Sequence, residues 1–230
     1  DIETHFNLTQ QLQPEEELTV YDFEAQDEEL FDKNRFFKKY HSYSTYLKLL
    51  RHWSKKYPKY VEYDHSIGKS VEGRNIVGFR ISNFRARNLK QKIWFNSGQH
   101  AREWVGPASQ FFIMSNLLRL AEDDKHMPEL LINYEFVFTP FSNPDGFEYA
   151  RTKDRLWRKN RKRNYDGSYG VDLNRNWDDH WNVVGGSKDP SDETYVGTGP
   201  FSEAETKAIS DYILKQGDLL LALTSILMVN

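Results

Sequence analysis

The sequence contains no cysteine, which excludes disulfide bonds, thiolate metal ligands and a cysteine nucleophile. It also lacks any apolar run near the roughly 18 residues of a membrane-spanning helix, so we expect no membrane partner. The chain begins with Asp1 and not with methionine. We therefore expect that its natural start is missing and that any signal peptide or pro-segment would lie upstream.

Lysine and arginine are absent from residues 1–32, which hold 11 aspartates and glutamates. The remaining residues carry 31 basic and 23 acidic side chains. Such an acidic arm is typical of a poorly ordered leader or linker, although it could instead fold against the basic body. We predict a leader over residues 1–35 and one globular domain over residues 36–230, since 38% hydrophobic content is enough for one core. We expect a monomer.

Hydrophobic periodicity and turn residues predict alternating helices and strands in the body. The expected elements are a helix over residues 46–57 with Thr45 as its N-cap, a glycine turn at 67–73, a strand at 76–81, a second strand at 91–96, a helix at 104–121 and a strand at 134–139. We expect the strands at 76–81 and 91–96 to be partners across the connection between them. Asn-Pro-Asp-Gly at 143–146 predicts a turn.

The C-terminal part of the sequence predicts one more helix and one more strand. Ser202 and Glu205 fit a capping box for a helix that runs to about Gln216, and residues 219–229 fit a buried strand. The order of strand, helix and strand around residue 100 is that of a βαβ unit. We therefore predict an α/β fold with a mixed, largely parallel open sheet and helices on both of its faces.

His100 and Glu103 lie between a predicted strand and a predicted helix. In an open α/β sheet, ligands bind where strands end in this way. The two-residue spacing lets one divalent ion reach an imidazole and a carboxylate together, and zinc suits these ligands. H-x-x-E alone is weak, because a surface ion pair at a helix start has the same pattern.

Residues 151–163 hold eight lysines and arginines around Trp157, a composition that a nucleic-acid surface also has. The cluster lies in a predicted connection and leads to Asn174 and Arg175, which stand between apolar side chains. A guanidinium in apolar surroundings needs an anionic partner, and its planar fork binds a carboxylate through two hydrogen bonds. We therefore favour carboxylate binding here and expect no nucleic acid.

Five segments together resemble the zinc metallocarboxypeptidases of the carboxypeptidase A/B type, peptidase family M14. They are His100-Ala101-Arg102-Glu103-Trp104, Asn143-Pro144-Asp145-Gly146, Leu156-Trp157-Arg158-Lys159, the run 170–177 with its Asn-Arg-Asn-Trp, and the run 199–205. They occur in that family's order and approximate spacing. The resemblance covers about the first two thirds of the family's catalytic domain and implies a carboxypeptidase-like α/β/α fold whose C-terminal part is missing.

The resemblance implies roles for seven residues. His100 and Glu103 would be two of three protein ligands of one zinc ion, and Asp172 would orient the imidazole. The C-terminal carboxylate of a peptide would be held by Asn174 and Arg175, with Arg102 at the same end. A further guanidinium, that of Arg158, would stabilise the oxyanion of the transition state.

The sequence departs from the family at its C-terminal end. The third ligand, a histidine, would fall where Ile226 or Leu227 stands, and no residue follows Asn230 to supply the family's substrate-capping tyrosine and general base. We predict that the other histidines do not replace the ligand; these are His5, His41, His52, His65, His126 and His180. Whether Glu193 or another acid of residues 189–193 donates a ligand or a base is open.

The resemblance implies a zinc-dependent metallocarboxypeptidase that hydrolyses the C-terminal peptide bond of peptides or proteins. By resemblance it would act outside the cell. We expect this chain to be a truncated and catalytically impaired form of such an enzyme. The alternative is a non-catalytic module that binds peptide C-terminal carboxylates.

Overall fold

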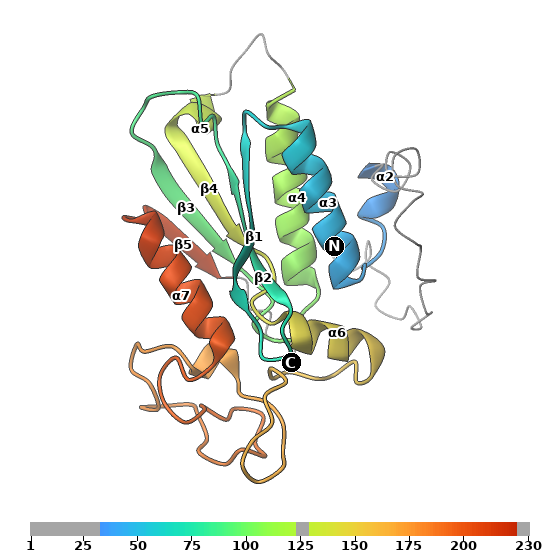
Figure 1. Ribbon diagram of the computed structural model, residues 1–230, viewed down its shortest axis with the longest axis vertical. Helices are drawn as coiled ribbons and strands as arrows, with labels where there is room; N and C mark the ends of the chain where they lie inside the picture. The colour runs from blue at the N-terminus through green and yellow to red at the C-terminus, as the bar shows by residue number, and fades with distance from the viewer. Residues whose placement is uncertain (1–32, 123–128, 225–230) are drawn as a thin grey trace.

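The computed structural model describes residues 33–122 and 129–224 (Figure 1). The α-helices are α2 (Lys33–Phe36), α3 (Tyr43–Lys56), α4 (Val105–Leu120), α5 (Glu129–Asn133), α6 (Pro144–Thr152) and α7 (Ala204–Gln216). A 3-10 helix, η2, spans Leu173–Arg175. The strands are β1 (Val61–Lys69), β2 (Asn75–Ile81), β3 (Gln91–Asn96), β4 (Tyr134–Thr139) and β5 (Leu221–Thr224). The acidic arm of residues 1–32 lies outside the described residues.

The strands form one open sheet in the order β1-β2-β4-β3-β5. The pairs β1/β2 and β2/β4 are antiparallel, whereas β3/β4 and β3/β5 are parallel. The expected mixed, open sheet is therefore confirmed, and its parallel part is the half that carries the loop with His100.

Helices cover both faces of this sheet, as predicted: α3 and α4 lie on one face and α7 on the other (Figure 1). The rings of Trp53 in α3 and Phe79 in β2 lie 6.3 Å apart between centroids. The preceding residue, Gly78, faces Tyr212 of α7, since a Cβ built there would lie 2.6 Å from the tyrosine ring. Neighbouring residues of a strand point to opposite faces, so one strand contacts both helical layers.

Aromatic rings fill the space between the sheet and the helices α3 and α4. Tyr46 lies 4.6 Å from Phe111 and 5.2 Å from Phe141 between ring centroids, and Phe141 lies 4.8 Å from Phe147. All four rings are buried. Phe141 follows β4 and Phe147 belongs to α6, so the core fixes the segment that leads from the sheet toward the site.

The expected pairing of residues 76–81 with 91–96 is wrong, because β4 lies between β2 and β3. The three residues Phe136, Val137 and Phe138 of β4 are all buried. A strand this apolar belongs in the middle of a sheet, where both of its faces are covered. Helix α4 connects β3 to β4 as a parallel crossover, as the βαβ order predicted.

Two local predictions are wrong because a helix begins where none was expected. Helix α3 begins at Tyr43, and the hydroxyl of its N-cap Ser42 accepts a hydrogen bond from Thr45 N. The predicted turn at 143–146 is the start of α6: Asn143 Oδ1 accepts a bond from Gly146 N, and Pro144 stands in the first turn. Asn and Pro are as suited to a helix start as to a turn.

The capping box at Ser202 does not form, although α7 runs to Gln216 as predicted. Glu203 is the N-cap, and the Ser202 hydroxyl bonds to Asn176 and Glu203 instead. The Glu205 carboxylate accepts a hydrogen bond from Val71 N at 3.1 Å. Partners from distant segments therefore replace the local reciprocal bonds of the capping box.

The strand predicted over residues 219–229 is described only as β5, and residues 225–229 lie outside the described residues. Its four residues are exposed, as is Leu220, so the prediction of a buried strand is wrong for this part. On its inner side β5 pairs with β3. Its outer side pairs with no other strand of the described sheet.

Within residues 33–122 and 129–224 we find no helix with both the length and the apolar character needed to cross a membrane.

The buried carboxyl of Glu205, at the start of α7, makes the stability of the fold depend on pH. Burial raises the pKa of Glu205 to about 7, against hydrogen bonds from Val71 N and Asn160 that lower it, and the nearby Glu203 adds to the rise. Below about pH 4.5 the carboxyl is protonated in both the folded and the unfolded chain. As the pH rises toward 7, the Glu205 carboxyl loses its proton in the unfolded chain but keeps it in the folded chain. The free energy of unfolding therefore falls.

We expect the free energy of unfolding to fall by about 2 kcal/mol between pH 5 and pH 8 through this group alone. Glu205→Gln should remove that part of the fall in denaturant titrations. Glu129→Gln makes the same change at an exposed position and should leave the pH dependence as it is. Parallel pH profiles for the wild type and Glu205→Gln would rule this explanation out.

Candidate functional site

The loop between β3 and α4 carries His100 and Glu103 at the carboxyl end of a parallel strand. This is the position predicted from sequence, and both side chains are buried. Gly98 has a φ of +65°, and a Cβ there would lie 3.1 Å from Pro140 O, so glycine allows the sharp turn next to the β4 loop. A backbone bond from Ala101 N to Arg158 O, 2.9 Å long, joins this loop to the segment after α6.

The imidazole of His100 lies between two carboxylates. Its Nδ1 is 2.7 Å from Glu103 Oε1, and its Nε2 is 3.1 Å from Asp172 Oδ1. Burial alone would lower the pKa of His100, but the hydrogen bonds to Asp172 and Glu103 raise it above its usual value. The ring therefore has a fixed orientation, with one nitrogen held from behind by Asp172 and the other next to Glu103.

Asp172 joins three parts of the site and has no exposed surface. Besides His100, it accepts hydrogen bonds from Arg158 Nη2 at 2.8 Å and Nε at 3.2 Å, and from Asn174 N at 3.0 Å. Burial alone would raise the pKa of Asp172, but the bonds from His100 and Arg158 hold it below its usual value. One ionised carboxylate thus positions an imidazole, a guanidinium and the start of η2.

Arg175 lies in η2, next to Asn174, and its guanidinium is oriented by backbone oxygens. Its Nε donates to Gly185 O at 2.7 Å and its Nη1 to Asn174 O at 3.2 Å. Among the described residues no acidic side chain forms an ion pair with it. The site therefore contains a positioned cation whose charge is not neutralised. The 3-10 turn with Arg175 is itself joined to the His100 loop, because Trp177 Nε1 donates to Gln99 Oε1 at 2.8 Å.

Arg102 differs from Arg175, because an acid of the chain already binds it. Its Nη1 and Nη2 lie 3.2 and 3.3 Å from the Glu193 carboxylate, and Nη1 also donates to Leu156 O. This answers the question that the sequence left open for Glu193, whose carboxylate pairs with a guanidinium. A substrate carboxylate would have to share Arg102 with it.

Asn143 and Lys159 support the site, a role that sequence patterns did not predict. The Asn143 amide donates to Gln99 O and to Lys159 O, at 3.1 and 3.0 Å, and so ties α6 to two loops. The buried ammonium of Lys159 donates to Pro190 O and Asp192 O, at 2.7 and 2.9 Å, and so holds the segment that carries Glu193. Such side-chain to backbone bonds between distant loops leave no periodic pattern in a sequence.

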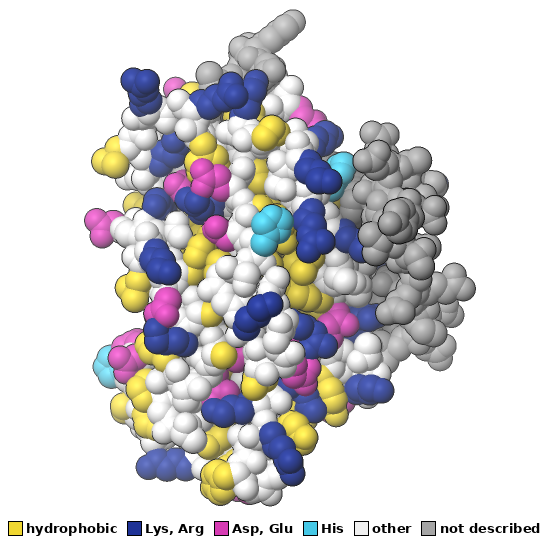
Figure 2. Space-filling view, viewed as in Figure 1, with side chains coloured by type: hydrophobic (Ala, Val, Ile, Leu, Met, Phe, Trp, Pro, Cys, Tyr) yellow, Lys and Arg dark blue, Asp and Glu magenta, His cyan; other side chains and the backbone are white. Residues whose placement is uncertain are grey.

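The basic stretch 151–163 is mostly used inside the molecule. Six of its eight cations have a partner in the described chain, and the exceptions are Lys153 and Arg163. Arg161, for example, stacks on three rings, those of Tyr149, Trp157 and Tyr169. On the face shown in Figure 2, lysines and arginines are spread among other side chains and do not gather in one patch. This speaks against a nucleic-acid surface on that stretch.

The donor atoms next to His100 fit zinc in kind but are few. Nitrogen and carboxylate oxygen are ligands that zinc accepts, and Asp172 occupies Nε2, which leaves Nδ1 for a metal beside Glu103. In residues 33–122 and 129–224 no three His, Asp or Glu side chains gather into a metal-binding group. Positions 226 and 227, where the third ligand was sought, lie outside the described residues. His180 is exposed and bonds to Asp179.

A buried imidazole between two carboxylates, at the carboxyl edge of a mixed α/β sheet, is the arrangement expected of a metallopeptidase-type site. The chain belongs to the zinc carboxypeptidase family of M14 peptidases, which it matches over residues 19–226. The resemblance stated from sequence is therefore confirmed.

Two curated relatives illustrate the similarity. Carboxypeptidase O of Homo sapiens is 38% identical over 187 residues, which are 80% of this chain and 50% of that protein. A metallocarboxypeptidase A-like protein of Trichophyton verrucosum is 35% identical over 210 residues, which are 91% of this chain and 49% of that protein. The chain thus spans about half the length of these relatives.

Solved structures show the same fold. Bovine thrombin-activatable fibrinolysis inhibitor, in complex with a tick carboxypeptidase inhibitor, superposes with a TM-score of 0.74 at 31% identity, over 82% of this chain and 61% of that one. Carboxypeptidase A of Helicoverpa armigera superposes with a TM-score of 0.73 at 34% identity, over 82% of this chain and 46% of that one. The carboxypeptidase-like fold predicted from sequence is confirmed.

Proposed function

We propose that the chain serves a zinc-dependent metallocarboxypeptidase reaction, hydrolysis of the C-terminal peptide bond of peptides or proteins. The observation that supports this most is the His100 imidazole fixed between Glu103 and Asp172, joined through Asp172 to the turn that holds Arg175. We also propose, from the family resemblance, that the protein acts outside the cell.

In this proposal four residues of the site have separate roles. His100 Nδ1 and Glu103 would hold one zinc ion, which supplies a Lewis acid for the peptide carbonyl. Asp172 keeps the imidazole turned toward that position. Arg158, held by the same carboxylate, would lie ready for negative charge that develops on the carbonyl oxygen.

Arg175 would bind the substrate's C-terminal carboxylate, with Asn174 beside it as a further donor. Two backbone oxygens orient its guanidinium, and no acidic side chain of the described residues pairs with it. A carboxylate is bound by an oriented, unpaired guanidinium of this kind. Arg102 would take part only if the substrate carboxylate shared its guanidinium with Glu193.

We further propose that these 230 residues alone are catalytically impaired. Two protein ligands hold zinc less firmly than three, and the described residues gather no third. Zinc-dependent hydrolysis of a blocked dipeptide by this chain at a rate typical of carboxypeptidases would contradict the proposed impairment.

The carboxylate anchor can be tested by binding. Arg175→Gln should weaken the affinity for a blocked dipeptide with a free C-terminal carboxylate by about 10–100-fold, since it removes charge-assisted hydrogen bonds. Titration calorimetry measures this. Arg87→Gln, which removes an exposed arginine outside the site, should change nothing. If the same dipeptide with a C-terminal amide bound the wild type as tightly as the acid, the proposed role of Arg175 would be wrong.

The second candidate function is a non-catalytic module for peptide C-terminal carboxylates. The free charge of Arg175, together with the lack of a three-ligand group in the described residues, favours it over a fully formed enzyme site. Calorimetry distinguishes the two functions: binding of free C-termini that does not respond to zinc supports the module, whereas zinc binding that is lost in His100→Ala supports the peptidase.

A further inference from the structure

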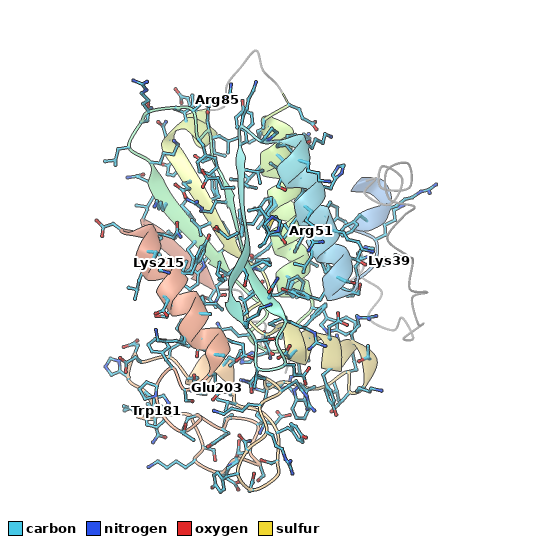
Figure 3. All side chains as sticks on the ribbon, in the orientation of Figure 1. Lys39, Arg51, Arg85, Trp181, Glu203 and Lys215 are labelled. Carbon is cyan, nitrogen blue, oxygen red and sulfur yellow. The ribbon has the colours of Figure 1, made fainter. Side chains whose placement is uncertain are left out.

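The loops that follow α6 line an open cavity whose lining residues differ from those of the site around His100. Its volume is about 520 Å³, and it is lined by Lys162, Arg163, Asn164, Tyr165, Gly167, Tyr195 and Thr198. This volume lies within the range of small-molecule pockets. The loops form the lower end of the molecule in Figure 1, and Figure 3 labels Glu203 at the start of α7 above them. None of the lining residues belongs to the site described above.

One wall of the cavity is a tight hairpin. Arg163 and Tyr169 form an antiparallel bridge, and Asn164 N donates to Ser168 O at 2.9 Å. The side-chain amide of Asn164 donates to Ser168 Oγ and to Gly170 O, both at 3.1 Å. Side chain and backbone thus hold the hairpin in one shape, and the cavity wall is preformed.

The wall carries one free positive charge. Lys162 Nζ lies 2.7 Å from Glu203 Oε1 and is neutralised by it. Arg163 is exposed, and its guanidinium forms no ion pair or hydrogen bond in the part of the chain that is described. The nearest acid of the hairpin, Asp166, is turned into its own loop, where it accepts bonds from Ser168 N and Oγ.

A tyrosine hydroxyl at the cavity also has no partner in the described part of the chain. Tyr195 is 4% exposed, yet its phenol oxygen makes no hydrogen bond among the described residues. A phenol hydroxyl that makes no hydrogen bond within the protein can donate one to a ligand oxygen. On the open side, Tyr165 is 83% exposed and offers a flat aromatic surface. The lining therefore combines a guanidinium, a donor hydroxyl and a ring.

We propose that this cavity binds a small aromatic ligand that carries an oxyanion, either a carboxylate or a phosphate ester. The oxyanion lies against Arg163 and accepts a hydrogen bond from the Tyr195 hydroxyl, while the ring of the ligand packs on Tyr165. Guanidinium groups bind both kinds of oxyanion through paired hydrogen bonds. The site is independent of zinc and of peptide hydrolysis.

Backbone amide NMR of the 230-residue chain, titrated with phenyl phosphate, benzoate and inorganic phosphate, tests the proposal. We expect saturable shifts at residues 162–170 and 195–198 with phenyl phosphate or benzoate, the stronger of the two identifying the oxyanion. Inorganic phosphate should bind about tenfold more weakly, since it lacks a ring. Arg163→Gln should weaken binding about tenfold.

Two variants sharpen the test. Tyr195→Phe should weaken binding severalfold without lowering the stability of the fold, because the hydroxyl has no protein partner. Lys153→Gln removes the other unpaired cation of the same basic stretch, which does not line the cavity, and should leave binding unchanged.

If Lys153→Gln and Arg163→Gln weakened ligand binding equally, the proposal would be overturned, because the ligand would then be attracted by the overall positive charge of the stretch and not by Arg163. Shifts confined to residues near Arg175, or no saturation by about 10 mM ligand, would overturn it as well.

Discussion

Asp172→Ala should lower the free energy of unfolding by about 4 kcal/mol, the largest effect that we expect from a single substitution. The change leaves the Arg158 guanidinium and the buried His100 imidazole without the carboxylate that both contact. It also frees Asn174 N, which bonds to the same oxygen as His100. Denaturant titration at neutral pH measures the loss.

The control for this prediction is Asp179→Ala, which removes an aspartate that is 90% exposed and paired only with exposed His180. We expect a change of less than about 0.5 kcal/mol, because exposed ion pairs contribute little. Similar losses at both positions would show that Asp172 does not connect the parts of the site as described.

Gly68→Ala should destabilise the fold by about 3 kcal/mol, because β1 and α7 touch at this point. A Cβ built on Gly68 would lie 2.4 Å from the Cβ of Ala208. The alanine methyl group is attached rigidly to the helix, so the contact can be relieved only by moving α7 away from the sheet. Thermal or chemical unfolding of the purified variant measures the effect.

A double-mutant cycle gives the matched control for Gly68→Ala. Ala208→Gly alone should cost about 1 kcal/mol through helix propensity. Added to Gly68→Ala, it should restore most of the lost stability, because the two methyl groups no longer collide. Gly199→Ala, where a Cβ meets nothing within 4 Å, should be nearly neutral. Additive losses in the double variant would mean that the β1–α7 contact is looser than described.

Helices and strands were predictable where the hydrophobic periodicity of a short segment defines them. The helix after the His100 loop and the strand Tyr134–Thr139 occur where hydrophobic periodicity placed them. The strand order was not predictable in the same way, because nothing within residues 76–96 indicates that β4 inserts between β2 and β3. Strand neighbours depend on which strand is apolar enough for the centre of the sheet, and that is a property of the whole chain.

In the candidate site, too, contacts between residues close in sequence were predictable and contacts between distant loops were not. Short spacing placed His100 and Glu103 together, and the resemblance placed Asp172 beside the ring. In the structure the His100 ring contacts both carboxylates, and the roles of the three residues stay a prediction. The pairing of Arg102 with Glu193 joins residues 91 positions apart and was not predicted. Sequence patterns report neighbours in a helix or strand, whereas loop-to-loop bonds of this kind depend on the finished fold.

The most direct test of the central claim, that His100 and Glu103 form a metal pair oriented by Asp172, is ¹⁵N NMR of the histidine side chains during zinc titration. We predict that zinc shifts Nδ1 of His100 while Nε2 stays protonated toward Asp172, and that Glu103→Ala weakens the response. Exposed His180 serves as the internal control. A His100 ring that does not respond to zinc, or that binds it through Nε2, would contradict the claim.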